Sequence, residues 1–260
     1  MNLGFIGTGN MASALIEGFK FKPENVYVSN KTPEKAKAIA ERLSVKYCET
    51  NEEVCKNANL IFICVKPNKY EEVLTEIKPF IKHKTIVSIA AGITIEFIKK
   101  VTDNNCKIVR TMPNTPAQVM CGTTGMCFCE KVSGAEQLLV MELFKRVGQA
   151  VRVQEKDMHA VVALSGSSPA YAYMFIEAMA KAGEKIGFNY EDAVTLAANS
   201  VMGAAKMVLE TGISPEQLTK NVCSPGGTTI EGVAVLEKDI DSLMFNTVKA
   251  VADKSVLLTK

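Results

Sequence analysis

The sequence predicts an α/β fold built from two domains, with strands and helices over residues 1–153 and helices alone over residues 154–260. Up to Val153, short apolar runs alternate with amphipathic stretches, which is the pattern of a parallel sheet covered by helices on both faces. After Val153 no convincing strand follows, and Gly or Pro separates the remaining segments. Helices are expected in this second part near residues 166–187, 190–210, 214–221, 229–238 and 241–258.

The first strand, expected over Leu3–Ile6, ends in a glycine-rich turn that opens a helix. Gly7 permits a tight turn and Gly9 removes a Cβ from the path of a pyrophosphate. Ala12 stands where the G-x-G-x-x-G/A pattern accepts glycine or alanine. The start of the helix offers free N–H groups and a positive dipole end to an anion. We therefore predict a Rossmann-type dinucleotide-binding domain; the alternative is a tight strand-to-helix turn without a ligand.

The end of the second strand, expected over residues 26–28, indicates the choice of cofactor. A fold that prefers NAD normally carries Asp or Glu there to bind the ribose 2′-hydroxyl. Here Ser29, Asn30 and Lys31 follow the strand, and no acidic residue comes before Glu34. With Thr32, which follows Lys31, the stretch offers two hydroxyls, an amide and a cation, which suit a 2′-phosphate better. NADP(H) is therefore favoured and NAD(H) stays open. An ordinary polar turn is the alternative.

The remaining elements of the first domain follow the same alternation. Residues 60–65 are continuously apolar, as expected of a central parallel strand buried on both faces. Thr50 and the acidic residues after it predict a capped short helix. The other strands are expected over residues 45–47, 85–89, 106–111, 123–129 and 150–153, and the other helices over Pro33–Leu43, 67–77 and 136–146.

Composition excludes several classes of protein. The chain has 260 residues, of which 47% are hydrophobic, and a net charge of only +2, which argues against nucleic acid or an anionic membrane as a partner. Eight cysteines without a C-x-x-C pair and only two histidines argue against zinc and against a disulfide framework. The cysteines are expected to be small buried hydrophobes in a reducing cytoplasm. Neither a signal peptide nor a membrane span is expected.

The expected helices of the second part carry apolar residues on several faces, more than a small monomeric domain can bury. Residues 170–187 and 193–210 are rich in Ala and Met all round, and such helices are buried in a large core or an interface. One short helical domain offers little interior for both. We therefore expect homodimerisation through this region, with a monomeric bundle as the alternative.

A second turn, over residues 221–231, has the sequence NVCSPGGTTIE. Ser224 begins a turn, two glycines follow, and Thr228 and Glu231 have the spacing of a capping box that opens a helix. Backbone N–H groups and two hydroxyls at a helix start form a receptor for a small carboxylate. The alternative is a well-capped helix after a tight turn.

Together these stretches resemble the pyrroline-5-carboxylate reductase family along essentially the whole chain. The matching stretches are GFIGTGNMASAL at 4–15, VKP at 65–67, AAG at 90–92, RTMPNTPA at 110–117, ALSGSSPAYAY at 163–173 and NVCSPGGTTIEGVAVLE at 221–237. One departure is visible: Ser168 stands where the family usually has glycine. Serine is acceptable near a helix start, so only small changes in packing or affinity are expected.

The resemblance implies NAD(P)H-dependent reduction of 1-pyrroline-5-carboxylate to L-proline, the last step of proline biosynthesis. It also implies intertwined homodimers, often assembled into a decamer, with each site shared between subunits. Carried over by position, the pyrophosphate site would comprise Gly7, Thr8, Gly9, Asn10 and Met11. The ribose and 2′-phosphate side would comprise Ser29, Asn30 and Lys31, with Asn51 beside the adenosine half. The nicotinamide end would be lined by Val65, Lys66, Pro67, Ala90, Ala91 and Gly92. The substrate carboxylate would meet Ser224, Gly227 and Thr228, and Thr229 would face the imine nitrogen as hydrogen-bonding partner or proton donor.

The residue inventory agrees with this chemistry. An iminium ion already carries the charge that draws a hydride, so one donor and accurate positioning suffice. Two other functions remain as alternatives. A β-hydroxyacid dehydrogenase would need a catalytic lysine early in the helical domain, where only Lys181 and Lys185 occur, far along the helix. A non-catalytic NADP(H)-binding regulator would leave the turn at Ser224 without a role.

Overall fold

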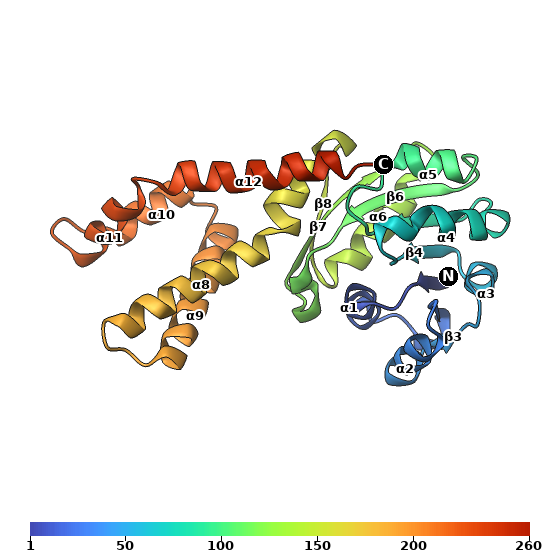
Figure 1. Ribbon diagram of the computed structural model, residues 1–260, viewed down its shortest axis with the longest axis horizontal. Coiled ribbons are helices and arrows are strands. Elements are labelled where there is room, and N and C mark those ends of the chain that lie inside the picture. The colour runs from blue at the N-terminus through green and yellow to red at the C-terminus, as the bar shows by residue number, and fades with distance from the viewer. The chain divides into compact units, whose positions relative to one another are not determined.

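The computed structural model describes all residues, 1–260 (Figure 1). Residue contacts divide the chain into two units, the first formed by Met1–Ser167 together with Ala250–Lys260 and the second by Ser168–Lys249. The α/β architecture followed by helices confirms the predicted fold class.

One eight-stranded sheet forms the centre of the first unit, with the strand order β3-β2-β1-β4-β5-β6-β7-β8. β1 and β4 are buried along their whole length, as the continuous apolar runs predict. The strands are β1 (Leu3–Ile6), β2 (Val26–Ser29), β3 (Lys46–Tyr47), β4 (Leu60–Ile63), β5 (Thr85–Ser88), β6 (Lys107–Met112), β7 (Gly122–Phe128) and β8 (Gly148–Arg152).

The expectation of a wholly parallel sheet is wrong at one pair. β7 runs antiparallel to β6, with Val109 opposite Phe128, while all other neighbours are parallel. The connection from β6 to β7 contains only the 3₁₀ turn Thr115–Val119. A parallel pair needs a crossover of a dozen or more residues, so this short connection returns the chain in the opposite direction.

Helices lie between most of the strands. Those of the first unit are α1 (Asn10–Phe19), α2 (Pro33–Leu43), α3 (Asn51–Asn57), α4 (Tyr70–Ile77), α5 (Ile95–Val101), α6 (Gly134–Lys145) and α7 (Met158–Val161). Thr50 caps α3 as expected, since its side chain accepts from the backbone N–H of Glu53. Three elements are not marked by the sequence pattern: α5, which Thr94 caps by accepting from Phe97 N, α7, and the π-helical turn Val162–Gly166.

Stacked aromatic rings fill the centre of the core. Phe5 of β1 stacks on Phe62 of β4, with ring centroids 4.6 Å apart, and Phe19 of α1 and Phe144 of α6 pack around them. All four rings are fully buried. The cluster packs α1 and α6 against β1 and β4. β1 is the strand that leads into the glycine turn.

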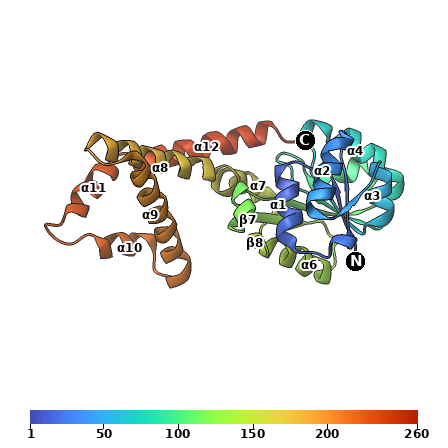
Figure 2. The same ribbon diagram turned by 90° about the horizontal axis from the view of Figure 1, so that it is seen from below.

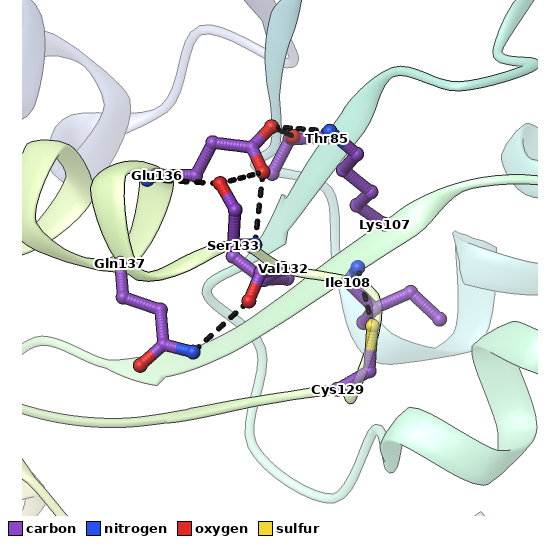
Figure 3. Close-up of polar contacts among 8 residues, drawn as sticks. All are labelled: Thr85, Lys107, Ile108, Cys129, Val132, Ser133, Glu136 and Gln137. Atoms are coloured by element: carbon purple, nitrogen blue, oxygen red, sulfur yellow. Dashed lines mark hydrogen bonds and ion pairs between the residues drawn. The ribbon is translucent and has the colours of Figure 1, made fainter.

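The partly buried carboxylate of Glu136 attaches the start of α6 to the sheet (Figure 3). Ser133 and Glu136 form a capping box, and Lys107 Nζ donates to Glu136 Oε1 across 2.6 Å. Burial alone would raise the pKa of the Glu136 carboxyl, but hydrogen bonds from Lys107 and Ser133 outweigh it and hold that pKa at about 2.

The second unit is helical, and almost nothing in it is buried by its own chain. Only Ala180, Ala193 and Ala197 are buried between residues 168 and 249, although α8 packs against α9 (Figures 1 and 2). Met174 is 73% exposed and Tyr173 59% exposed. Such a large exposed apolar surface indicates an interface. The helices are α8 (Ser168–Lys185), α9 (Tyr190–Thr211), α10 (Pro215–Val222), α11 (Thr228–Leu236) and α12 (Ile240–Leu257), whose last turns belong to the first unit.

The eight cysteines are all free, and five of them are buried. Burial raises the pKa of Cys48 to about 11 and that of Cys55 to about 12. Cys121 is exposed, contrary to expectation, and lies in the connection between the 3₁₀ turn Thr115–Val119 and β7. None of the helices has the length and apolar character needed to span a membrane.

Candidate functional site

The glycine turn between β1 and α1 has the backbone that the sequence predicts. Gly7 has φ +94°, and a Cβ there would lie 2.8 Å from the carbonyl oxygen of Cys64, so a side chain does not fit. Gly9 has φ −78°, and no atom lies within 4 Å of the place its Cβ would occupy. Gly9 is also the N-cap of α1 and provides no side-chain cap. The first N–H groups of α1 therefore remain available to an anion.

A cleft of about 760 Å³ opens over this turn at the carboxyl edge of the sheet. Its volume is typical of a pocket for a cofactor-sized ligand. The cleft brings together predicted residues from four βα connections: Gly7, Thr8, Gly9, Asn10, Asn30, Lys31, Asn51, Val65 and Lys66. Six predicted residues do not line it: Met11, Ser29, Pro67, Ala90, Ala91 and Gly92.

Two side chains join the glycine turn to the end of β2. Asn30 Nδ2 donates to Thr8 Oγ1 across 2.7 Å, while its Oδ1 accepts from the backbone N–H of Thr32 at 3.0 Å. Gly7 N donates to Ser29 O at 2.9 Å. The position of Asn30 is thus fixed before any ligand arrives.

A second chain of hydrogen bonds runs along the floor of the cleft. Ser29 is buried and its hydroxyl donates to Asn51 Oδ1 across 2.7 Å. Asn51 Nδ2 donates in turn to Glu76 Oε2 at 2.9 Å. Glu76 was not among the predicted site residues, because no local pattern relates a residue late in α4 to the first turn of α3.

Charged side chains of both signs surround the open end of the cleft. Lys31 Nζ lies 3.9 Å from Glu72 Oε1, with its side chain 82% exposed, and Lys69 Nζ donates to Glu72 Oε2 at 2.8 Å. The hydrogen bond from Lys69 and the charges of both lysines lower the pKa of Glu72. Lys35 lines the same cleft. An incoming phosphate group therefore meets several cations, two of which, Lys31 and Lys69, share Glu72 as an acidic partner.

The carboxyl ends of the three central strands are held together beneath residues 90–92. Tyr70 Oη donates to Ile63 O across 2.6 Å and Ser88 Oγ donates to Tyr70 Oη at 3.1 Å. Thr111 Oγ1 donates to Ser88 O at 2.9 Å. Burial raises the pKa of Tyr70, so the phenol stays protonated. Ala90 and Ala91 follow directly from this rigid edge.

The second predicted turn lies in the helical unit. Gly226 has φ +74°, and a Cβ on Gly227 would lie 2.5 Å from Ser224 Oγ, so the serine hydroxyl occupies the space that the glycine leaves. Gly227 N donates to Ser224 O at 3.0 Å. Ser224, Thr228 and Thr229 are exposed.

The predicted capping box at Thr228 and Glu231 is wrong. The N-cap of α11 is Gly227, which makes no side-chain cap, and Thr228 is already the first helical residue. A capping hydroxyl must stand one position earlier to accept from the first turn. The first N–H groups of α11 are therefore uncapped, which leaves them free to bind an anion.

No group of three or more His, Cys, Asp or Glu side chains lies close enough to hold a metal ion. The sheet order, the glycine turn and the cleft above it define a Rossmann-type dinucleotide-binding protein with an added helical domain. A model described as NADP oxidoreductase, coenzyme F420-dependent, matches residues 2–92, and one described as pyrroline-5-carboxylate reductase dimerisation matches residues 155–258. The chain belongs to the pyrroline-5-carboxylate reductase family.

Relatives and solved structures support this family over the full length. The chain is 40% identical over 264 residues to the pyrroline-5-carboxylate reductase of Escherichia coli, covering 99% of this chain and 98% of the relative. It is 34% identical over 259 residues to pyrroline-5-carboxylate reductase 2 of Bacillus subtilis, covering 97% and 93%. The structure of the Coxiella burnetii pyrroline-5-carboxylate reductase matches with a TM-score of 0.94 and 34% identity, covering 100% of this chain and 98% of the other. A Plasmodium falciparum pyrroline carboxylate reductase with NADP bound matches with a TM-score of 0.88 and 33% identity, covering 100% and 98%.

Proposed function

We propose that this chain reduces 1-pyrroline-5-carboxylate to L-proline with a hydride from NAD(P)H, the last step of proline biosynthesis. NADPH is the preferred donor and NADH the second. The observation that carries the proposal is the cleft over the glycine turn, which is lined by Gly7, Gly9 and Lys31. The match of the chain to this family over its whole length supports the same reaction.

The cofactor is bound along the cleft from the glycine turn outward. The pyrophosphate lies against residues 7–11 and accepts from the uncapped N–H groups of α1. Lys31 and Asn30 bind the 2′-phosphate and the ribose. Ser29 contributes indirectly, because its hydroxyl donates a hydrogen bond that orients Asn51 beside the adenosine half. The nicotinamide end is lined by Val65, Lys66, Pro67, Ala90, Ala91 and Gly92. The cofactor supplies the hydride, and these residues orient it.

The substrate is held by the turn at residues 224–229. Its carboxylate is bound by Ser224, Gly227 and Thr228 at the uncapped start of α11. The hydroxyl of Thr229 donates a hydrogen bond or a proton to the ring nitrogen, and protonation of that nitrogen makes the neighbouring carbon electrophilic. That carbon gains a hydride while the C=N double bond becomes a C–N single bond, and the nitrogen finishes as the secondary amine of proline.

The assembly follows from the exposed helices. We propose that residues 1–153 bind the cofactor and that residues 154–260 form a dimerisation and substrate-binding domain. A second copy of this chain covers the apolar surface that the second unit leaves exposed. Decamers built from such dimers and a cytoplasmic location complete the proposal.

The test is the oxidation of NADPH and NADH with pyrroline-5-carboxylate, with each cofactor titrated separately and followed by nicotinamide absorbance. Turnover that favours NADPH supports both the reaction and the role of Lys31. Turnover that favours NADH retains the reaction and removes the argument for a 2′-phosphate site. Folded protein that binds NADPH without turnover contradicts the proposal and supports a regulator.

A further inference from the structure

Residues 255–260, the C-terminal segment, pack against the loop that follows β5. We propose that this segment is a positioning element for the nicotinamide end of the cofactor, because it fixes the backbone of residues 90–94. The inference rests on the proposed function, and it concerns contacts within the first unit alone.

Two hydrogen bonds attach the segment to the loop. Lys260 N donates to Gly92 O across 2.8 Å, and Thr94 Oγ1 donates to Lys260 O across 2.7 Å. The same Thr94 hydroxyl accepts from Phe97 N at 3.0 Å and thereby caps α5. One side chain thus joins the loop, the helix after it and the C-terminal segment, which Figure 1 shows ending beside α5.

The close approach of the C-terminal segment to the loop requires glycine at position 92. Gly92 has φ +76°, and a Cβ there would lie 2.6 Å from the carbonyl oxygen of Leu258. Both the backbone angle and the approach of the segment therefore require glycine. The resemblance of AAG to a nicotinamide-binding stretch does not explain that approach, which comes from the far end of the chain.

Two further contacts hold the segment and the loop from the sides. His159 Nδ1 lies 2.9 Å from the hydroxyl of Ser255, which is buried. Glu155 Oε1 accepts from Ile95 N at 2.8 Å and from Arg110 Nη1 at 2.9 Å. His159 thus has a partner in the C-terminal segment, and Arg110 of β6 supports the start of α5 through Glu155.

This attachment matters because Ala90 and Ala91 have no side chain with which to adjust to a ligand. The position of any group they contact is set by their backbone alone. That backbone is fixed at one end by β5, where Ser88 joins the strand ends, and at the other end by the C-terminal segment. Small misplacements of a reacting ring lower the rate of hydride transfer strongly.

The test compares Lys260→Pro with Lys260→Ala. Proline removes the N–H that Gly92 O accepts, while alanine keeps it and removes only the side chain, whose ammonium lies 5.9 Å from the centroid of Phe97. Each variant is assayed for kcat, for KM with NADPH, and for the Kd of adenosine 2′,5′-bisphosphate, which lacks the nicotinamide. Lys260→Pro is expected to raise the KM for NADPH by about threefold to tenfold, the effect of one lost hydrogen bond, and to lower kcat. The Kd of the bisphosphate and the kinetics of Lys260→Ala stay unchanged.

A second pair of variants tests the same attachment independently, in case Lys260→Pro does not fold. Thr94→Asp keeps a cap for α5 but cannot donate to Lys260 O, whereas Thr94→Ser retains both bonds. The inference requires Thr94→Asp to reproduce the Lys260→Pro kinetics and Thr94→Ser to resemble the unchanged protein. Unaltered NADPH kinetics in both disruptive variants would overturn it, and so would an equal loss of NADPH and bisphosphate binding, which indicates general loosening. Turnover by the unchanged protein tests the proposed function separately.

Discussion

The hydroxyl of Ser29, at the end of β2, donates a hydrogen bond of 2.7 Å to the side-chain oxygen of Asn51, in the first turn of α3. Because the serine is buried, this bond occupies its hydroxyl hydrogen and leaves the amide of Asn51 directed to Glu76. The positive charge at this end of the cleft comes instead from exposed lysines, of which Lys31 follows β2 most closely. We therefore expect recognition of a 2′-phosphate to be separable from the organisation of the cleft floor.

Lys31→Met is expected to raise the KM for NADPH by about tenfold, the effect of losing a charged hydrogen bond to the 2′-phosphate. The KM for NADH changes little, because a ribose hydroxyl carries no charge. Steady-state kinetics with both cofactors measure the ratio. The matched control is Lys37→Met on α2, the helix that follows Lys31, since Lys37 lies over the ring of Tyr47 and does not line the cleft. Equal losses with both cofactors would contradict this assignment.

Ser29→Ala is expected to raise the KM for both cofactors together, by about threefold, because it removes the donor that orients Asn51. The ratio of NADPH to NADH preference should stay the same. Kinetics with each cofactor at saturating substrate give the comparison. A selective loss with NADPH would show that the serine hydroxyl contacts the 2′-phosphate itself.

The two glycines of the first turn should fail in different ways. Gly7→Ala places a Cβ 2.8 Å from Cys64 O at φ +94°, and should lower the free energy of unfolding by at least about 2 kcal/mol. Gly9→Ala meets no atom within 4 Å, so its stability should change by less than about 0.5 kcal/mol. Its Kd for NADPH should nevertheless rise more than about tenfold, because the new methyl group displaces a phosphate from charged hydrogen bonds. Chemical denaturation and NADPH fluorescence separate the two effects, and normal NADPH binding by Gly9→Ala would place the pyrophosphate elsewhere.

Glu136→Gln is expected to lower the free energy of unfolding at neutral pH by about 1–2 kcal/mol, after allowance for solvent screening of a partly exposed pair. Glutamine can still complete the capping box, so the loss reports the charge. The folded carboxyl has a pKa of about 2 against an ordinary value of 4.5. Its contribution is therefore fully present above about pH 4.5 and disappears as the pH falls towards 2. Denaturation curves at several pH values should show the difference between the two proteins narrowing over that range, whereas Glu142→Gln, whose pair with Lys145 is exposed, should show almost none.

Local patterns in the sequence were sufficient for most of the first unit. Apolar runs fixed the strands, and the glycine turn and the helix Pro33–Leu43 lie where the sequence predicts them. The direction of β7 was missed because it depends on the length of a connection and not on the strand itself. The error at Thr228 arose because a one-residue shift of the helix start moves a hydroxyl from the cap into the first turn.

Contacts between segments far apart in the sequence could not be predicted from local patterns. The bond from Thr94 to Lys260 joins residues 166 positions apart, and that from Asn51 to Glu76 joins residues 25 apart. Neither residue pair has a periodicity or spacing that marks it. Tyr70 was expected only as part of a helix, and its role under the strand ends depends on which strands become neighbours in the sheet.

Thr229→Ala is expected to lower kcat/KM for pyrroline-5-carboxylate by about a hundredfold, as for the loss of a positioned proton donor. The threonine is exposed at the start of α11, next to N–H groups that no side chain caps, so its hydroxyl is free to bond the ring nitrogen. Thr229→Ser keeps the hydroxyl and should retain most of the activity. The Kd for NADPH should be the same in all three proteins, because the glycine turn belongs to the other unit. A loss below about threefold in Thr229→Ala would remove the proton donor from the mechanism and leave positioning of the substrate carboxylate by Ser224 and Thr228 as the main contribution of this turn.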